Sequence, residues 1–118
     1  MSADAVRLFV YGTLLRGERG AQLMAGAEWI GPAVTAPVFT LHRVEWFPAL
    51  ARGGATAVVG EVYRVPAAVL AALDDYEGED YARVEVALAD GTVAEAYVMH
   101  AERVVGLEVI ASGDWRRR

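Results

Sequence analysis

The sequence predicts a small α+β domain with a barrel-like, largely antiparallel sheet and one or two helices. Three observations lead to this fold class. At 118 residues the chain has the length of a single domain, so residues 1–118 are expected to share one hydrophobic core. Most apolar stretches are short, rich in strand-forming residues and bounded by glycine or proline. The clearest helical spacing of apolar residues follows Pro66.

The first half of the chain predicts strands separated by turns. Residues 6–11 are a short apolar run that stops at Gly12, where the backbone can turn without a side-chain penalty. The glycines within residues 16–25 predict a loop that leads into a short helix. Two more strands are expected at residues 29–34 and 38–44, interrupted at Gly31-Pro32 and Pro37, and residues 52–54 then form a loop.

The second half predicts a strand, a helix and a hairpin. Residues 57–65 read as a strand that leads directly into the helix at Pro66. Residues 81–88 alternate between apolar and polar side chains, which is typical of a half-buried strand. Asp90-Gly91 is a strong hairpin turn signal, and residues 92–99 supply the returning strand. With a last strand at residues 104–110, about six strands share the core as a curled sheet or small barrel.

The predicted helix places an acidic residue, Glu77, on its apolar face. Pro66 suits a first helical position, and the spacing puts Leu70, Leu73 and Glu77 on one side; the full apolar stripe comprises Val69, Leu70, Ala72, Leu73 and Tyr76. Several acids also fall in the last turn, where the helix macrodipole opposes them. Two explanations stay open: a general base whose pKa is raised by burial, dipole and neighbouring acids, or a frayed, solvated helix end.

Composition excludes several classes of function. The formal net charge is −5, and the one dense basic run is Arg116-Arg117-Arg118, which is expected to be a solvated tail, so nucleic acid is not expected as a partner. The sequence has no apolar run of about eighteen residues and no signal-peptide pattern, which predicts no membrane association and a cytoplasmic location. The absence of cysteine removes disulfides, thiolate metal sites and a cysteine nucleophile.

The remaining residues exclude most catalytic machinery. The two serines, Ser2 and Ser112, do not lie on a strand-to-helix nucleophile elbow. His42 and His100 are isolated in sequence, so no metal and no cofactor are expected. The segment after Tyr11 lacks the lysine of a phosphate-binding P-loop. What survives is acid–base chemistry by a carboxylate, with backbone amides of residues 11–14 as an anion-binding turn or as an ordinary strand-ending turn.

A chain with so few catalytic groups suits an intramolecular reaction, in which one part of the substrate attacks another part of the same molecule. Holding the two ends of one molecule in a reactive geometry removes roughly 7–11 kcal/mol of barrier. One positioned general base adds about 10² to 10⁴ in rate. The protein then has to supply shape, anion recognition and one proton shuttle.

An ordered series of short motifs covers nearly the whole chain. In sequence order the motifs are Leu8-Phe9-Val10-Tyr11-Gly12-Thr13-Leu14, Phe47-Pro48-Ala49, Gly60-Glu61-Val62-Tyr63, Leu73-Asp74-Asp75-Tyr76-Glu77-Gly78, Tyr81 with Arg83, Ala96-Tyr97, and Gly113-Asp114-Trp115. Their order and spacing resemble the gamma-glutamylcyclotransferase-like proteins, in the branch of gamma-glutamylamine cyclotransferases and AIG2-like proteins. The resemblance implies a mixed fold around a barrel-like sheet, with a cavity between the Tyr11 loop and Glu77.

The resemblance also implies an activity and a site. In such enzymes the Tyr-Gly-Thr-Leu backbone holds a gamma-glutamyl group while a glutamate moves a proton from the alpha-amine to the departing amine, which yields 5-oxoproline. Glu77 would therefore be the catalytic acid and base, and the substrate-binding residues would be Tyr11, Gly12, Thr13 and Leu14. Thr13 stands where glutathione-directed branches carry serine, which favours gamma-glutamylamines as the small-molecule substrate.

Three further residues are candidates for contact with that substrate. Tyr81 and Tyr97 are cavity walls or hydroxyl donors, or simply part of the core. Arg83 supports Glu77 or a substrate carboxylate, or forms a surface ion pair. Two rival functions remain at this stage: a non-catalytic binding module for a small carboxylated metabolite, and an interaction protein in which Glu77 is exposed.

Overall fold

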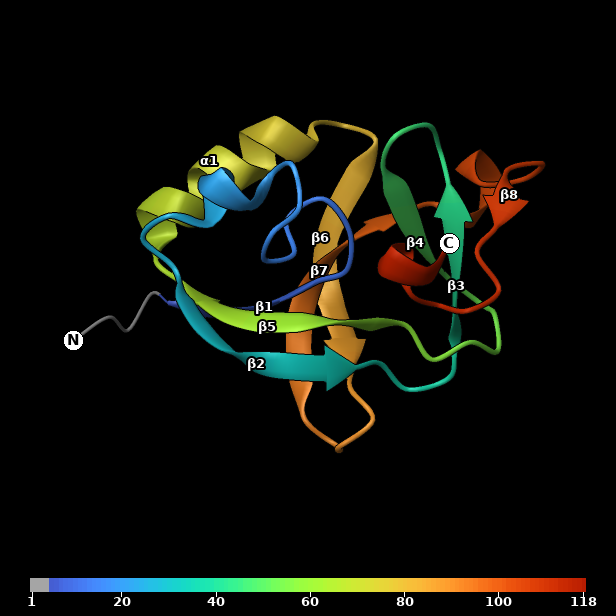
Figure 1. Cartoon of the computed structure of the whole chain (residues 1–118), viewed down its shortest axis with the longest axis horizontal. Helices are drawn as coiled ribbons and strands as arrows, with labels where there is room; N and C mark the ends of the chain where they lie inside the picture. The colour runs from blue at the N-terminus through green and yellow to red at the C-terminus, as the bar shows by residue number, and fades with distance from the viewer. Residues whose placement is uncertain (1–4) are drawn as a thin grey trace.

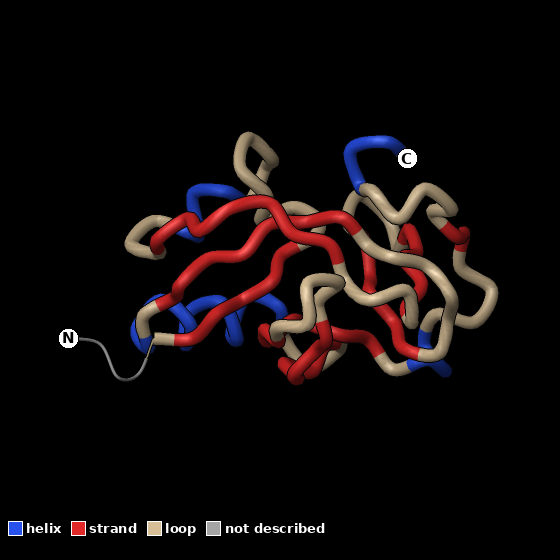
Figure 2. The backbone as a smooth tube through the Cα atoms, turned by 90° about the horizontal axis from the view of Figure 1, so that it is seen from below, coloured by secondary structure: helices blue, strands red, loops and turns tan. Residues whose placement is uncertain are grey.

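The computed structural model describes residues 5–118 and confirms the predicted fold class. One mixed, largely antiparallel sheet has the strand order β2-β5-β1-β7-β4-β3-β8, and β6 pairs with β7 (Figure 1). The strands curve around the interior instead of lying in one plane (Figure 2). Within this part of the chain the strands are β1 (Val6–Val10), β2 (Glu28–Val34), β3 (Phe39–Arg43), β4 (Pro48–Arg52), β5 (Val59–Val65), β6 (Tyr81–Ala87), β7 (Val93–Met99) and β8 (Glu108–Val109).

The helices are one α-helix, α1 (Ala67–Glu77), and three short 3-10 helices, η1 (Ala21–Met24), η2 (Ala101–Arg103) and η3 (Trp115–Arg117), among the residues described. None of them is long and apolar enough to cross a membrane within residues 5–118. The interior of the sheet is filled by large apolar side chains, and the fully buried ones include Leu8, Phe9, Leu41, Leu50, Leu73 and Trp115.

Two strand predictions need correction. Residues 5–118 contain eight strands where the sequence predicted about six, chiefly because residues 48–52 form β4. Pro48 is tolerated there because it is the first residue of the strand. The expected strand at residues 104–110 is reduced to Glu108–Val109, which pairs with β3 at His42 and Arg43.

Strand β7 holds the two halves of the sheet together. Glu95 pairs with β6 and, in parallel, with Leu8 of β1. Three residues further on, Val98 pairs with β6 and, in parallel, with Leu50 of β4. Because β6 occupies one edge of β7 throughout, β1 and β4 must share the other edge. The sheet therefore forks where β1 ends and β4 takes its place.

The hydroxyl group of Tyr11 bridges this fork. It donates a hydrogen bond to the carbonyl oxygen of Tyr97 on β7 at 2.6 Å and accepts one from the N–H of Leu50 on β4 at 3.2 Å. Both bonds are buried. A side chain thus completes the backbone hydrogen bonding at a point where no strand can reach.

Helix α1 lies beside η1 over one end of the sheet (Figure 1). Leu70 and Leu73 are buried, as the spacing predicts, but Ala72 and Tyr76 of the same predicted stripe are exposed. Pro66, predicted as the first helical residue, is the N-cap residue, so the helix begins one position later, at Ala67. Gly78 ends the helix with φ +72°, a left-handed conformation that glycine adopts without strain.

The basic C-terminal run is not a solvated tail. Trp115 is only 1% exposed, and the guanidinium group of Arg118 stacks 3.8 Å from the centre of its ring. Arg116 forms ion pairs with Glu61, at 3.3 Å, and with Glu18, at 3.6 Å. The prediction of a solvated tail was wrong because charge composition does not show that a buried acid, Glu61, lies next to Arg116 in the fold.

Candidate active site

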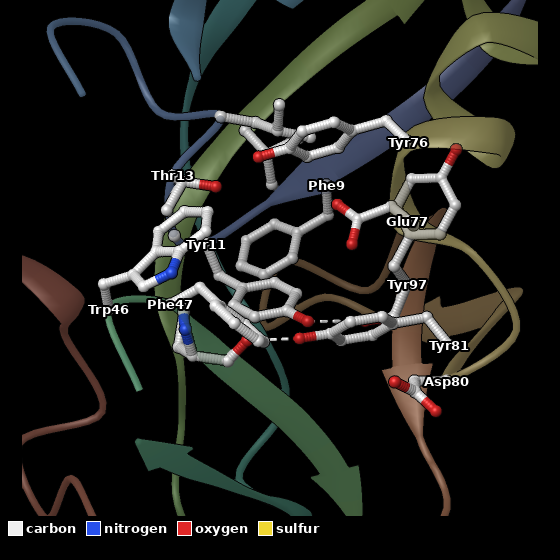
Figure 3. Close-up of a pocket in the computed structure, with 14 residues that line it drawn as sticks. Phe9, Tyr11, Thr13, Trp46, Phe47, Tyr76, Glu77, Asp80, Tyr81 and Tyr97 are labelled. Carbon is white, nitrogen blue, oxygen red and sulfur yellow. Dashed lines mark hydrogen bonds between the residues drawn. The ribbon is translucent and has the colours of Figure 1, made fainter. Parts of the chain in front are cut away.

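A cavity of about 240 Å³ opens where the sheet forks. Its walls come from the loop after β1, the turn between β3 and β4, the segment from the end of α1 to the start of β6, and one side chain of β7 (Figure 3). The residues that line it are Phe9, Val10, Tyr11, Gly12, Thr13, Leu14, Trp46, Phe47, Pro48, Tyr76, Glu77, Asp80, Tyr81 and Tyr97. Half of the lining residues are aromatic, and two are acidic. Asp80 is exposed, whereas Glu77 is half-buried and faces the rings of Phe9 and Tyr11 in the view of Figure 3.

Glu77 is half-buried in this lining. Removal from water raises the pKa of its carboxyl group from 4.5 to about 7. The expectation that the acids of the same turn add to this rise is not met. Asp75 is exposed, and the carboxylate of Asp74 is neutralised by Arg83, which lowers the pKa of Asp74 through its hydrogen bonds. Aromatic surroundings, and not charge repulsion, set the acidity of Glu77.

The loop after β1 supplies three residues to the cavity lining, Gly12, Thr13 and Leu14. Leu15 N–H donates to the carbonyl of Gly12 at 3.1 Å, and Gly20 N–H donates to that of Thr13 at 2.8 Å, so this loop is a folded turn. Within residues 5–118, the N–H groups of Gly12, Thr13 and Leu14 donate to no protein acceptor. Three neighbouring N–H groups in one turn are a suitable ligand set for an anion.

Gly12 is required by a close approach to the opposite wall. A Cβ atom at this position would lie 2.4 Å from Cγ of Pro48, closer than carbon atoms can approach. The absence of a side chain therefore lets the loop pack directly on the first residue of β4. The sequence predicted a turn at Gly12 and did not predict this contact with Pro48.

The two candidate tyrosines both line the cavity, and both hydroxyl groups donate to protein acceptors. Tyr81 donates to the carbonyl of Pro48 at 2.8 Å, and Tyr97 donates to Asp74 at 2.7 Å. Burial raises the pKa of each phenol, so both stay neutral near pH 7. Their rings form walls of the cavity, and their hydroxyl groups tie β6 to β4, through Tyr81, and β7 to α1, through Tyr97.

Arg83 is the one sequence-predicted site residue outside the lining of the cavity. Its guanidinium group binds both carboxylate oxygens of Asp74, at 2.9 and 3.1 Å, and also pairs with Glu95. This network lies behind Tyr97 and fixes the last turn of α1 to β6 and β7. Arg83 thus supports the helix turn that carries Glu77, and its predicted contact with substrate stays a prediction.

Comparison with known proteins identifies the family. The family model described as "Gamma-glutamyl cyclotransferase, AIG2-like" matches residues 8–117. The chain belongs to this family. The gamma-glutamylcyclotransferase family protein YtfP of Escherichia coli K12 is 36% identical over 115 residues, covering 96% of this chain and 98% of its own.

Solved structures of the gamma-glutamylcyclotransferase type share the fold. A uropathogenic E. coli-specific protein superposes with a TM-score of 0.88 at 28% identity, over 96% of this chain and 94% of that one. A mouse AIG2-like protein superposes with a TM-score of 0.77 at 25% identity, over 93% and 88% of the two chains.

Half of the residues that line the cavity were not among the site residues predicted from the sequence. Trp46 and Phe47 come from the turn before β4, Pro48 is the first residue of that strand, and Tyr76 and Asp80 flank Glu77. Phe47-Pro48-Ala49 was recognised as a motif, and this motif was the available signal for the missing wall. It was not assigned to the site because β4 itself was not predicted, so nothing placed these residues opposite the Tyr11 loop.

Proposed function

We propose that this protein is a gamma-glutamylcyclotransferase that converts the gamma-glutamyl group of a small substrate to 5-oxoproline and releases an amine. The observation that carries the proposal is a single half-buried carboxylate, Glu77, whose pKa is about 7, in the same cavity as the free N–H groups of residues 12–14. A pKa near the working pH is what a group needs to act as base and then as acid.

The reaction needs one proton relay. Glu77 takes a proton from the alpha-ammonium group of the substrate, and the freed amine nitrogen attacks the gamma-carbonyl carbon. A new C–N bond closes the five-membered ring, and the bond from the gamma-carbon to the departing nitrogen breaks. The protonated Glu77 gives its proton to the departing nitrogen. The ring nitrogen then loses a second proton, which passes through the same carboxylate to the released amine, so the amine leaves as an ammonium ion and the enzyme returns to its starting state without a covalent intermediate.

The rest of the cavity suits this role. The N–H groups of Gly12, Thr13 and Leu14 would hold the alpha-carboxylate of the substrate, which orients its amine. The rings of Phe9, Tyr11 and Tyr81 exclude water, and this both raises the pKa of Glu77 and protects the reacting atoms.

The first test replaces the carboxylate. Glu77→Gln keeps the side-chain volume but removes the proton carrier, so turnover of an accepted gamma-glutamyl compound should fall by about 10² to 10⁴. Formation of 5-oxoproline from a panel of gamma-glutamyl amides is the measurement. Glu79→Gln is the matched control because Glu79 is exposed two residues away and does not line the cavity.

Two results would overturn the proposal. One is wild-type turnover in a folded Glu77→Gln protein. The other is a ligand-induced rise in melting temperature, across the panel, with no 5-oxoproline formed. The second result would instead support a binding module for a small carboxylated metabolite.

A further inference from the structure

The loop that contains the free N–H groups of residues 12–14 is attached to the rest of the fold on both sides of them. Before them, the ring of Tyr11 is fixed in the fork of the sheet by the two buried hydrogen bonds of its hydroxyl group. After them, the backbone of Arg16 is held by two side chains, Glu61 and Arg116. Neither of these two residues lines the catalytic cavity, and the proposed reaction gives neither of them a role.

Glu61 lies on β5 at the point where β1 ends. It pairs in register with Val10, the last residue of β1, and it is only 7% exposed. One of its carboxylate oxygens accepts a hydrogen bond from the N–H group of Arg16 at 3.0 Å. The backbone pairing of β1 with β5 therefore stops at Val10, and the side chain of Glu61 binds the same chain again further along the loop.

Arg116 completes this attachment from the other end of the sequence. Its guanidinium group donates to the backbone carbonyl of Arg16 and lies 3.3 Å from the second carboxylate oxygen of Glu61. Its Nε also lies 3.6 Å from the carboxylate of Glu18, in the same loop. The N–H and the carbonyl of Arg16 are thus both bound by side chains that are paired with each other. Trp29 stacks on the guanidinium group of Arg16, 3.5 Å from its ring centre.

This attachment bears on the direction of the N–H groups of residues 12–14. The hydrogen bond from Leu15 N–H to the carbonyl of Gly12, at 3.1 Å, closes a turn around them. Such a bond fixes the shape of the turn but not its tilt relative to the cavity. The tilt depends on where the loop is attached to the sheet, and the attachment at Arg16 is the one that charged side chains make.

We propose that Glu61 and Arg116 are positioning residues for substrate binding, which hold the backbone of Arg16 so that the N–H groups of residues 12–14 point at the alpha-carboxylate of the substrate. This inference rests on the proposed cyclotransferase function and adds two residues to it, one of them in the basic run that composition assigned to solvent. The alpha-carboxylate keeps its charge throughout the reaction, so a misplaced loop should weaken substrate binding more than it slows the chemical step.

The test compares two substrates that differ only at the alpha-carboxylate. An accepted gamma-glutamyl compound is paired with its alpha-carboxamide, which keeps the reacting amine and the gamma-carbonyl but lacks the negative charge. In Arg116→Gln the preference for the acid, as a ratio of kcat/KM values, should fall by about five- to tenfold, mainly through a higher KM for the acid. The effect of the carboxamide on the reactivity of the amine is the same in both proteins and cancels from this comparison.

Two further arginine variants separate position from charge. Arg117→Gln removes the same charge from the neighbouring residue, whose side chain is 81% exposed, and should leave the preference unchanged. Arg116→Lys keeps the charge, but an ammonium group cannot reproduce the several directed contacts of a guanidinium group, so the preference should recover only in part. Full recovery in Arg116→Lys would show that charge alone is sufficient and would overturn the positioning role.

Glu61→Gln tests the attachment from the other side. It keeps the volume of the buried side chain but removes the charge that holds Arg116, so the preference for the acid should fall as it does in Arg116→Gln. The side chain of Arg116 is 41% exposed, so Arg116→Gln is expected to fold even if Glu61→Gln does not. All assays are run well below the melting temperature of each variant, where a loss of stability alone does not distinguish the two substrates.

The possible failures are distinguishable. An unchanged preference in Arg116→Gln, or an equal loss for acid and carboxamide, overturns the positioning role and leaves the cyclotransferase function standing. If no compound yields 5-oxoproline in the wild type, the function fails instead, and calorimetric binding of the same two compounds decides the inference. Tighter binding of the acid that weakens in Arg116→Gln but not in Arg117→Gln supports the positioning role, and any other binding result overturns it.

Discussion

Glu77 illustrates how far a single residue can be interpreted from sequence. The spacing Leu70, Leu73, Glu77 placed the carboxylate on the apolar face of the helix and left open either a raised pKa or a solvated helix end. In the structure Glu77 is half-buried and its pKa is raised. The cause was only partly predictable. Burial against aromatic rings follows from a tertiary arrangement, whereas the neighbouring acids that the sequence suggested are exposed or neutralised.

The raised pKa of Glu77 makes folding stability depend on pH. The folded state binds the Glu77 proton more tightly than the unfolded chain, since its pKa is about 7 against 4.5. This contribution to stability is fully present below about pH 4.5 and is lost as pH rises towards 7. At roughly 1.4 kcal/mol per unit, the loss is about 3 kcal/mol.

The measurement is urea unfolding of the wild type and Glu77→Gln at about pH 5 and about pH 8. The variant does not ionise at this position, so its stability relative to the wild type should increase between the two pH values. Glu79→Gln should show no such change, because Glu79 is exposed. A constant difference between wild type and Glu77→Gln would contradict the burial of the carboxylate.

At the scale of elements, local signals predicted the strands that stand beside clear turns. Residues 81–88 and 92–99 alternate and flank Asp90-Gly91, so β6 and β7 follow from sequence. Strand β4 does not, because it begins with Pro48 and contains no β-branched or aromatic residue, so it has no intrinsic strand signal. It becomes a strand through pairing with β3 and, at Leu50, with β7. The pairing with β7 joins residues far apart in the sequence, so no local signal predicts it.

The fork between β1 and β4 depends on the Tyr11 hydroxyl group. Tyr11→Phe leaves the buried Leu50 N–H and Tyr97 carbonyl without this partner, so the free energy of unfolding should fall by about 1–3 kcal/mol. Tyr63→Phe is the matched control, because Tyr63 is buried on β5 and its hydroxyl group makes no hydrogen bond within the described chain. Urea unfolding compares the two, and equal losses would refute the bridging role.

At the scale of the whole molecule, composition predicted one domain and an α+β class, and misjudged the C-terminus. Arg116, Arg117 and Arg118 look equivalent in sequence. In the fold, Arg116 reaches the buried Glu61, whose carboxylate also accepts from Arg16 N–H at 3.0 Å, while Arg117 is 81% exposed. Only the tertiary position of Glu61, on β5, distinguishes them.

Substitution of these two arginines tests the docking of the C-terminus. Arg116→Ala leaves the buried Glu61 with one donor fewer and should lower the free energy of unfolding by about 1 kcal/mol, a modest loss because Arg116 is partly exposed. Arg117→Ala should have almost no effect, since its pair with Asp114 is long, at 3.8 Å, and exposed. Equal melting temperatures for the two variants would show that the C-terminal ion pairs contribute nothing.

The shared edge of β7 also has a consequence for how the protein is made. Both strands that frame the cavity reach β7 only through distant partners, Leu8 with Glu95 and Leu50 with Val98. Such pairings form late, because a long loop must close before they contribute stability. During synthesis, Phe9, Trp46 and Phe47 leave the ribosome long before residues 93–99. Aromatic rings that line the cavity of the folded protein therefore stay exposed to solvent until β7 has been synthesised. During that time they can aggregate or bind a chaperone.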